Sequence, residues 1–517
     1  MMRSGVLIVG AGPTGLVLAL WLAKLGVKVR IVDKAAQPGT TSRAVAVQAR
    51  TLELYSQLDL AAEVIARGHK TPGVNLWVGG RKAARVPFET VGAELTPYPF
   101  LFIFPQDEHE RLLIERLEGF GVSVERGVEL TSFEDKADGV SATLRREGGT
   151  EEVCEAAYIA GCDGARSVVR QVMGVGFPGG TYRQVFYVAD VEASGPAIDG
   201  ELHVDLDEAD FLAAFPLAGK GRARLIGTVR DERADRPDTL TFADVSGRAI
   251  DNLKVQVGRV NWFSTYHVHH RVADHFAKGR AFLLGDAAHI HSPAGGQGMN
   301  TGIGDAINLA WKLAQVLGGR APAGLLETYE AERIGFARRL VASTDRAFSI
   351  ATADGPLARL LRTRIAPLLI PLALSAGAAR EFAFRTVSQI TLNYRGGPLS
   401  AGKAGKVRGG ERLPWVVAGG EDNFASLAAM CWQVHVYGAA AAELAAWCAG
   451  QGVALHVFDW RAEYAAAGLK RDALYLLRPD SYVALADASG SPGAVERYAA
   501  ARGLSLPPLG EVPPKAG

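Results

Sequence analysis

Apolar residues near the start of the chain fall into three short blocks. Residues 6–9 form an unbroken apolar run, and residues 16–23 carry apolar side chains at helical spacing. A second strand is expected at 27–32, with the sequence Val-Lys-Val-Arg-Ile-Val, and it ends at Asp33. Glycines at positions 10, 12 and 15 separate the first two blocks. This order predicts a strand, a tight turn, a helix and a second strand, which is the opening of a parallel α/β unit.

The central part of the chain is rich in strand patterns. An amphipathic helix is expected at 107–118, a strand at 122–125, and a hairpin from 140–144 and 152–159. Further strands are expected in a second layer, at 73–99, 185–191, 211–217, 222–229 and 262–268. Their connections are polar and contain glycine and proline, so this second layer is predicted to be a mainly antiparallel sheet.

The first pattern returns after this sheet. Residues 279–285 are again apolar and end at Asp286, and a loop then leads to a helix from about Asn300 to Gly318. The antiparallel sheet is therefore predicted to be inserted into the α/β unit. Helices are expected to continue to about residue 390, and a small strand-helix-strand-hairpin unit follows residue 400.

Composition narrows the class of protein. The chain has 517 residues, 48% of them hydrophobic and 21% charged, with a formal net charge of +1. These values indicate a multidomain soluble protein and give no reason to expect a nucleic-acid partner. The four cysteines form neither a C-x-x-C pair nor a metal-ligand spacing, and no metal site is predicted. They favour reduced thiols in a cytoplasmic protein.

Two apolar segments raise the question of membranes. The N-terminal run resembles a signal peptide, but glycines and Pro13 interrupt it at dinucleotide spacing, so a targeting role is rejected. Residues 365–374 are too short to span a bilayer and contain two prolines. A buried or interdomain segment is favoured there over a patch that docks on a membrane surface.

The spacing of the N-terminal glycines points to a ligand. Gly10 permits the turn, Gly12 leaves room for a pyrophosphate, and Gly15 lets helix and strand pack closely. Asp33 follows Gly15 at about the 20-residue spacing at which a carboxylate binds a ribose hydroxyl. A glycine-rich buried turn would not explain this spacing, so an adenine dinucleotide site is predicted.

Three motifs together resemble those of class A flavoprotein monooxygenases, the family of para-hydroxybenzoate, phenol and aromatic polyketide hydroxylases. They are the glycine turn 10–15, the Asp-Gly segment 162–170, and the Gly-Asp segment 285–289 with Pro293. The resemblance extends over about residues 5–345. The C-terminal part is similar to the thioredoxin-like domain of phenol and polyketide hydroxylases, most specifically at 477–480, but lacks the redox C-x-x-C.

The fold that this implies is α/β, with three domains and one linking segment. A Rossmann-like FAD-binding domain would comprise 1–72, 100–177 and 278–345, and an inserted, mainly antiparallel substrate-binding sheet would comprise 73–99 and 178–277. A helical interdomain segment would follow at 346–399, and the thioredoxin-like C-terminal domain at 400–517.

The resemblance implies bound FAD, with NAD(P)H as a transient co-substrate. The cofactor-binding residues that it implies are Gly10, Gly12, Pro13, Thr14, Gly15, Asp33, Lys34, Arg43, Gln106, Val128, Asp163, Gly285, Asp286, Gly296, Gly298, Met299 and Asn300. A physical argument supports the last of these, because amides at a helix N-terminus stabilise the negative charge of reduced flavin. For Arg43, a place in a solvated loop is the alternative to phosphate binding.

The implied reaction is hydroxylation of a phenolic or polycyclic aromatic substrate by O2, through a C4a-hydroperoxyflavin. Pro293, Arg43 and His289 are the candidate catalytic residues, and hydrogen bonding to neighbouring groups is the alternative for His289 and His291. The candidate substrate-pocket residues are Tyr187, Phe211, Phe215, Tyr266 and His267, for each of which simple packing is the alternative.

Other functions on the same fold stay open. A Baeyer–Villiger enzyme, an epoxidase or a halogenase-like enzyme is possible, although the Trp-x-Trp-x-Ile-Pro stretch of flavin halogenases is absent from the sequence. A non-catalytic FAD-binding sensor is the alternative from another class. The length of the insert favours a bulky phenol over a small benzoate, and the protein is expected to be a monomer or homodimer without a membrane span.

Overall fold

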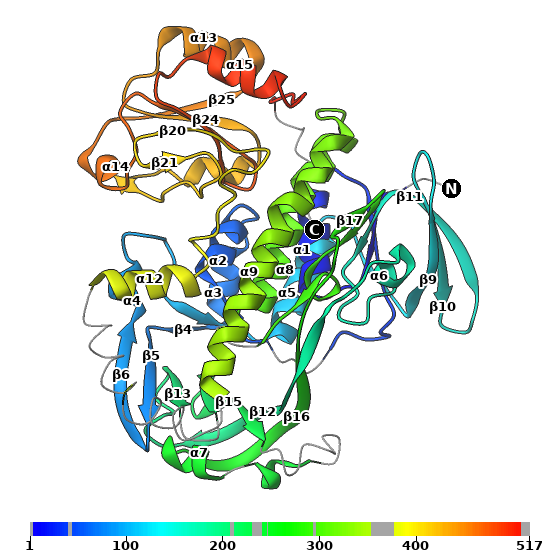
Figure 1. Ribbon diagram of the computed structural model, residues 1–517, viewed down its shortest axis with the longest axis vertical. Helices are drawn as coiled ribbons and strands as arrows, with labels where there is room; N and C mark the ends of the chain where they lie inside the picture. Colours follow the sequence, from blue (N-terminus) through cyan, green and yellow to red (C-terminus); the bar gives the residue numbers. More distant parts are fainter. Residues whose placement is uncertain are drawn as a thin grey trace.

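The computed structural model describes residues 4–39, 44–206, 211–229, 240–245, 247–292, 296–352, 365 and 377–507. Arg43, Pro293 and all but Ile365 of the apolar run 365–374 lie outside the described residues. Figure 1 shows three sheets at separate positions, with the long helices α8 and α9 between them. No helix within the described ranges combines the length and apolarity needed to cross a membrane.

The first sheet, which we call the parallel sheet, contains the N-terminal glycine turn. Its central order is β17-β18-β11-β1-β2-β8, and β10 and β9 extend it from β11. Its strands are β1 (Ser4–Val9), β2 (Val29–Asp33), β8 (Val124–Arg126), β9 (Val128–Asp135), β10 (Val140–Arg146), β11 (Glu151–Gly161), β17 (Ala277–Lys278) and β18 (Ala281–Leu283). The predicted strand-turn-helix-strand opening and the predicted β10–β11 hairpin are both confirmed.

Segments far apart in sequence meet in this sheet. β18 pairs in parallel with β11, which pairs in parallel with β1. The intervening residues fold into the second sheet, so the predicted insertion is confirmed. The strand after the insertion is shorter than expected, because the chain turns into a 3-10 helix, η4 (Gly285–Ala287), directly after Leu284.

The second sheet, which we call the inserted sheet, has the order β19-β16-β12-β15-β14-β13-β5-β6. Its strands are β5 (Gly73–Val78), β6 (Arg81–Pro87), β12 (Gly179–Ser194), β13 (Leu202–Leu206), β14 (Phe211–Pro216), β15 (Arg222–Val229), β16 (Gln256–Val272) and β19 (His289–Ile290). All neighbouring pairs are antiparallel except β13 and β5. The predicted mainly antiparallel character is therefore confirmed.

A three-stranded sheet lies beside the inserted sheet in Figure 1. Its order is β3-β7-β4, with β3 (Ala46–Val47), β4 (His69–Thr71) and β7 (Leu101–Ile103). The helices of this half of the chain are α1 (Pro13–Lys24), α2 (Ala49–Ser56), α3 (Ala61–Arg67), α4 (Phe88–Gly92), α5 (Gln106–Gly119), α6 (Val168–Met173), α7 (Gly247–Asn252), α8 (Gly298–Leu317), α9 (Glu327–Thr352) and α12 (Gly377–Val387). Short 3-10 helices lie at Phe242–Asp244 and Ala323–Leu326.

The C-terminal unit forms the orange and red part of Figure 1. Its main sheet has the order β21-β20-β27-β26-β24-β25, and β22 pairs with β23. Its elements are β20 (Ala401–Ala404), β21 (Val407–Arg408), β22 (Val417–Ala418), β23 (Glu421–Asp422), a 3-10 helix (Ala425–Ala429), β24 (Gln433–Tyr437), α13 (Ala442–Gln451), β25 (Ala454–Phe458), α14 (Ala462–Ala466), β26 (Leu474–Leu477), β27 (Val483–Asp487) and α15 (Pro492–Ala500). The predicted strand-helix-strand-hairpin order is confirmed.

A single apolar core joins the C-terminal unit to the parallel sheet. Trp311 of α8 meets Trp432 edge-to-face, with ring centroids 5.6 Å apart, and both rings are fully buried. The two units therefore meet at a buried pair of indole rings. Separation of the C-terminal unit would expose both indole rings to water.

Buried charges cross the same boundary. The Arg478 guanidinium donates to Glu332 Oε1 (2.6 Å) on α9 and to Asp480 Oδ2 (2.6 Å). Lys312 Nζ donates to Glu332 Oε2 (2.9 Å), and none of these side chains is more than 2% exposed. Burial acts to raise the pKa of Glu332, but Arg478 and Lys312 hold it at about 2. Glu332 therefore stays ionised, and each charge of the group is compensated.

Replacing Arg478 with methionine tests this connection. Arg478→Met leaves two buried carboxylates without their main cation, and breaking a buried ion pair typically costs about 3–5 kcal/mol. We expect a large fall in the melting temperature, measured by calorimetry. Arg471→Met is the matched control, because Arg471 is 66% exposed and lies 3.8 Å from Asp472. Equal melting temperatures for the two variants would contradict a stabilising role for the buried group.

Candidate functional site

Five neighbouring strands of the parallel sheet end at the same edge. β18, β11, β1, β2 and β8 all run in parallel, so their carboxyl ends lie side by side. The residues that end or follow these strands are Asp286, Asp163, Gly10, Asp33 and Arg126. Open α/β sheets bind ligands at this edge. The sequence-predicted site residues are therefore gathered where such a sheet binds its ligand.

The glycine turn is shaped by close backbone approach. Gly10 has φ +103°, and a Cβ there would lie 2.3 Å from the carbonyl oxygen of Cys162. A Cβ on Gly15 would lie 2.0 Å from the carbonyl oxygen of Gly10. At Gly12, by contrast, the nearest atom would be Glu110 Oε1 at 4.0 Å. Contacts within the protein therefore require glycine at positions 10 and 15. Gly12 instead leaves open space at the N-terminus of α1, which a bound phosphate needs.

Thr14 fastens the glycine turn to the Gly-Asp segment. A Cβ on Gly285, which has φ +58°, would lie 2.7 Å from Thr14 Oγ1. A Cβ on Gly302 of α8 would lie 2.4 Å from the same oxygen. The side chain of Thr14 therefore fits between two glycines that come from beyond the insertion. The two halves of the divided parallel sheet interlock at this residue.

The acidic residue after β2 is held by backbone amides. Ala11 N–H donates to Asp33 Oδ2 (2.7 Å), and Ala35 N–H donates to Asp33 Oδ1 (2.8 Å). Arg126 Nη1 lies 3.8 Å from the carboxylate. Each carboxylate oxygen can accept a further bond, so Asp33 keeps capacity for a ribose hydroxyl. Lys34 next to it is exposed.

Two further predicted contacts lie near this edge. Gln106 begins α5, and its Nε2 donates to Glu110 Oε1 (2.7 Å). Val128 begins β9 and is buried. Burial raises the pKa of Glu110, although Gln106 and Arg126 act in the opposite direction. A carboxyl group that protonates readily therefore faces the open side of Gly12.

The Asp-Gly segment caps a short helix and clamps the Gly-Asp segment. The N–H groups of Val168 and Val169 donate to Asp163 Oδ2 (2.7 and 3.2 Å). Arg170 of the same helix donates to the carbonyl oxygen of Ala287 (2.8 Å) and to that of Ala165 (2.7 Å). Burial raises the pKa of Asp163.

His289 lies in a buried hydrogen-bond network. Its Nε2 bonds Asp305 Oδ2 (2.6 Å), the Gly285 N–H donates to the same oxygen (3.0 Å), and Arg333 Nε donates to Asp305 Oδ1 (2.6 Å). Arg333 also donates to the Tyr394 hydroxyl (3.1 Å). Burial acts to raise the pKa of Asp305, but Arg333 and His289 hold it below its ordinary value.

The catalytic role of His289 stays a prediction. The side chain is 2% exposed, and its Nε2 is bonded to Asp305. These contacts favour the alternative drawn from the sequence, hydrogen bonding to neighbouring groups.

The N-terminus of α8 is fixed by Asn300. Its Oδ1 accepts from Gln48 N–H and Thr51 Oγ1 (both 2.8 Å), and its Nδ2 donates to the carbonyl oxygens of Ala46 (2.9 Å) and Gly296 (3.0 Å). Its side chain is thus fully used within the protein. Only its backbone N–H, with those of Gly298 and Met299, is in position to meet a ligand at the start of the helix. α8 begins at Gly298, two residues earlier than predicted.

His291 faces this helix start. Its Nδ1–H donates to the carbonyl oxygen of Ser292 (2.8 Å), so Nε2 carries a lone pair. A Cβ on Gly298 would lie 3.6 Å from that Nε2. Burial lowers the pKa of His291 to about 4, so the ring is a neutral hydrogen-bond acceptor near pH 7.

Several buried polar atoms at this edge lack a partner among the residues that the structure describes. They are Asp163 Oδ1, Arg126 Nη2, His291 Nε2 and Ser292 Oγ. Buried polar groups are normally hydrogen-bonded, so orphaned ones call for a ligand or water. Donors and acceptors together, beside an open glycine turn, fit an extended ligand with phosphate, hydroxyl and heterocyclic groups. The residues present therefore fit FAD.

The inserted sheet has two different apolar faces. Its front face carries Phe186, Ala213, Phe215 and Ile226, and it packs toward Val45, Ala46 and Ile103 of the three-stranded sheet. Its back face packs on α7. Ala46 also accepts from Asn300, so the front face is the one that adjoins the start of α8.

Three of the five predicted pocket residues lie on the front face. Phe211, Phe215 and Tyr266 pack there, and the Tyr266 ring lies 5.8 Å from that of Phe186. Tyr187 and His267 lie off the front face, and their place in a substrate pocket stays a prediction. Tyr187 stacks on Phe263 in the back-face core, with ring centroids 6.1 Å apart. His267 is exposed and lies between Tyr266 and Val268, which both point to the front.

Sequence reasoning missed four residues that shape this site. Asp305 is a charged residue on α8, which is otherwise mostly buried, and that position was the available signal. Arg333 lies on the buried side of α9, which also has exposed residues. Glu110 lies one helical turn after the predicted Gln106. Arg126 ends a strand at the ligand-binding edge. Within the described ranges, no group of three or more His, Cys, Asp or Glu side chains is placed to hold a metal ion.

Removing the charge of Asp305 should weaken dinucleotide binding. Asp305→Asn leaves Arg333 buried without its carboxylate, so the Gly285 turn and α8 lose their common anchor. We expect the Kd for FAD, measured by flavin fluorescence quenching, to rise by at least about tenfold. Glu201→Gln, which breaks an ion pair with Arg85 in the inserted sheet, is the control. A fall in the melting temperature of the apoprotein with an unchanged Kd would reduce Asp305 to a purely structural role.

Glu110 should make dinucleotide affinity depend on pH. Its raised pKa keeps part of the population neutral in mild acid, and ionisation at higher pH places a negative charge beside the open turn at Gly12. We expect the Kd for FAD to rise with pH as this carboxyl ionises, above the range in which an ordinary glutamate does so. Glu110→Gln should flatten the profile. Identical profiles for the two proteins would show that Glu110 does not face the phosphates.

Comparison with known proteins agrees with this geometry. Residues 3–344 match the family described as FAD binding domain. The chain is 38% identical over 408 residues to the 6-methylpretetramide 4-monooxygenase of Streptomyces rimosus, covering 77% of this chain and 71% of that protein. It is 33% identical over 505 residues to a flavin-dependent monooxygenase of Mycobacteroides abscessus, covering 94% and 97%.

A solved structure gives the same result. The anhydrotetracycline hydroxylase OxyS of Streptomyces rimosus superimposes with a TM-score of 0.77 at 28% identity, covering 98% of this chain and 100% of that one. The chain therefore belongs to the FAD binding domain family, and within it to the class A flavin-dependent monooxygenases.

Proposed function

We propose that the protein hydroxylates a bulky or polycyclic phenol, with O2 as the oxidant and NAD(P)H as the reductant. The observation that carries this proposal is the aromatic front face of the inserted sheet, which adjoins the start of α8. Relatives named for polycyclic and phenolic substrates support it. They include the 6-methylpretetramide enzyme and a pentachlorophenol 4-monooxygenase of Sphingobium chlorophenolicum, 32% identical over 68% of this chain.

The residues of the parallel sheet would hold the cofactor. The glycine turn and the N-terminus of α1 would bind the pyrophosphate, and Asp33 would bind the adenosine ribose. The exposed carboxylate of Asp286, which follows β18, would bind the ribityl side. Bound FAD supplies the electron transfer and oxygen activation that side chains do not.

The start of α8 would hold the reactive end of the cofactor. The N–H groups of Gly298, Met299 and Asn300 form the positive end of a 20-residue helix and would stabilise negative charge there. Because Asn300 is bonded on all sides, this donor group is preorganised. His291 Nε2 would accept a hydrogen bond beside it.

The front face would orient the substrate and exclude water. Its rings Phe186, Phe211, Phe215 and Tyr266 offer a broad apolar wall for a planar substrate. The buried Arg224, which donates to Asp190 Oδ1 (2.6 Å), lies 5.7 Å from the Trp262 ring on the same face. The Arg224–Asp190 pair would be the polar group on the front face that orients a substrate hydroxyl.

The remaining sequence predictions stay part of this proposal. Arg43 and Pro293 would complete the loops on either side of the cofactor. The C-terminal unit would be a thioredoxin-like domain with a structural role, joined by the helical segment 346–399. A monomer or homodimer is the proposed state in solution.

Turnover with a panel of phenols tests the function. The holoenzyme should oxidise NADH or NADPH faster when a polycyclic phenol is present, and the product should gain one oxygen atom by mass spectrometry. Phe215→Leu on the front face should raise the substrate KM several-fold, whereas Phe263→Leu on the back face is the matched control. Turnover of small benzoates alone would refute the proposed substrate class. A bound flavin that no reductant reduces would favour the alternative of a non-catalytic FAD-binding sensor.

A further inference from the structure

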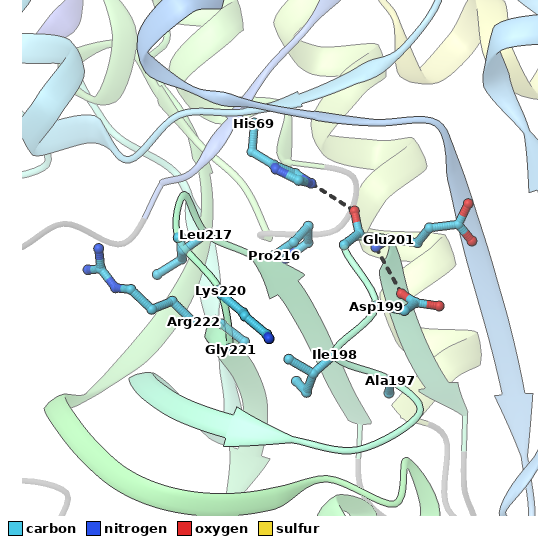
Figure 2. A pocket seen from close by; sticks show the side chains of 13 residues that line it. His69, Ala197, Ile198, Asp199, Glu201, Pro216, Leu217, Lys220, Gly221 and Arg222 are labelled. Carbon is cyan, nitrogen blue, oxygen red and sulfur yellow. Dashed lines mark hydrogen bonds between the residues drawn. The ribbon is translucent and has the colours of Figure 1, made fainter.

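A cavity of about 430 Å³ opens at one end of the inserted sheet. Two connections at that end form it. One links β12 to β13 through residues 195–201, and the other links β14 to β15 through residues 217–221. His69 of β4 covers it, and its Nε2 bonds the carbonyl oxygen of Gly200 (2.8 Å) (Figure 2).

The cavity lies at the end of the inserted sheet, outside the cofactor edge, and its lining includes Ala197, Ile198 and Ala223 of the back-face core and Leu217 of the front-face core. His69 pairs with Ile103 of β7, which pairs with Ala46 of β3. Two strand spacings, about 10 Å, therefore separate His69 from the residue that contacts Asn300. Leu217 borders the cavity and also belongs to the front-face core, so the two regions share a wall.

The lining of the cavity is apolar on several sides. Ala197, Ile198, Pro216, Leu217 and Ala223 all line it. A volume of this size is within the range of small-molecule sites, which are mostly apolar with a few placed polar groups. The cavity thus has the size and the surface to hold a planar ring system.

A buried chain of polar groups fixes the 195–201 connection that forms one side of the cavity. Trp77 Nε1–H donates to His203 Nδ1 (2.9 Å), and an indole nitrogen can only donate. His203 Nε2 must therefore carry the ring proton when the imidazole is neutral, and it donates to Asp199 Oδ1 (2.7 Å). The Glu201 N–H donates to the same oxygen (2.9 Å). Trp77 and His203 are 5% and 1% exposed, so Asp199 is held from behind by a fixed scaffold.

The cations of the lining differ in direction. Figure 2 shows the Lys220 amine pointing into the cavity and the Arg222 guanidinium pointing away from it. Arg222 Nη1 donates to the carbonyl oxygen of Ala218 (3.3 Å). The other carboxylate, Glu201, is already paired with Arg85 and accepts from Asn75 Nδ2 (2.7 Å). Figure 2 also shows the carboxylates of Asp199 and Glu201 pointing away from the cavity, so among the charged residues labelled there Lys220 is the one that points into it.

We propose that this cavity is a second ligand site, which takes an aromatic acid. The rings would pack on Ile198, Pro216 and Leu217, and the acid group would meet the Lys220 ammonium. The site binds its ligand without reduction of the cofactor, so it does not depend on the proposed hydroxylation. Because it shares a wall with the front face, it can hold an aromatic acid next to the reaction region.

Equilibrium binding to the oxidised holoenzyme tests the proposal. The probe is 2-naphthoate, which has fused rings and a carboxylate, and titration calorimetry gives its Kd. We expect Lys220→Gln to raise the Kd by about tenfold, as loss of a hydrogen bond to a charged group does. Lys403→Gln, at an exposed lysine of the C-terminal unit, should leave it unchanged.

Two further measurements separate this site from the cofactor site. 1-Naphthol, which lacks the carboxylate, should bind wild type and Lys220→Gln equally. Binding at this site is recognised by a Kd that rises in Lys220→Gln. The visible spectrum of the flavin should not change as the naphthoate binds there. Three results would overturn the proposal: no binding at millimolar concentration, an unchanged Kd in Lys220→Gln with an unchanged melting temperature, or binding that tracks a flavin spectral change.

Discussion

The carboxylate of Asp305 is the contact on which the cofactor edge depends. It is fully buried and accepts from the Gly285 N–H and Arg333 Nε, while its Oδ2 also bonds His289. A buried carboxylate is tolerated only when charges and hydrogen bonds compensate it. Since its partners lie on the Gly-Asp turn and on α9, Asp305 ties α8 to both. Thr14, between Gly285 and Gly302, then joins this assembly to the N-terminal glycine turn.

The C-terminal unit extends the same principle of compensated burial. Arg333 reaches Tyr394, and Glu332 beside it on α9 reaches Arg478. Neighbouring residues of one helix therefore connect the cofactor edge and the C-terminal unit. At its other end α9 meets the inserted sheet, where the Tyr182 hydroxyl donates to Asp345 Oδ1 (2.6 Å). We infer that the three units of the protein fold as one body around α8 and α9.

The sequence predicted most of the longer elements and the edge of the sheet, because glycine spacing and strand ends are local signals, but it did not predict β9, β13 or α7. It could not assign faces of the inserted sheet. Phe186 and Tyr187 alternate as strand residues must, but both faces are buried, so alternation does not reveal which one adjoins the cofactor. Networks such as Asp305 with Arg333 join residues remote in sequence, and only the packing of helices brings them together. The Trp77–His203–Asp199 chain was hidden for the same reason.

The central claim is that one cofactor is held jointly by the glycine turn and by the α8 start, which the inserted sheet separates in sequence. The most direct measurement is titration of the apoprotein with FAD, followed by a crystal structure of the complex. The account predicts one FAD per chain, with its pyrophosphate at residues 10–15 and its isoalloxazine against Gly298–Asn300. Absence of FAD binding, or a flavin ring bound away from the α8 N-terminus, would contradict it.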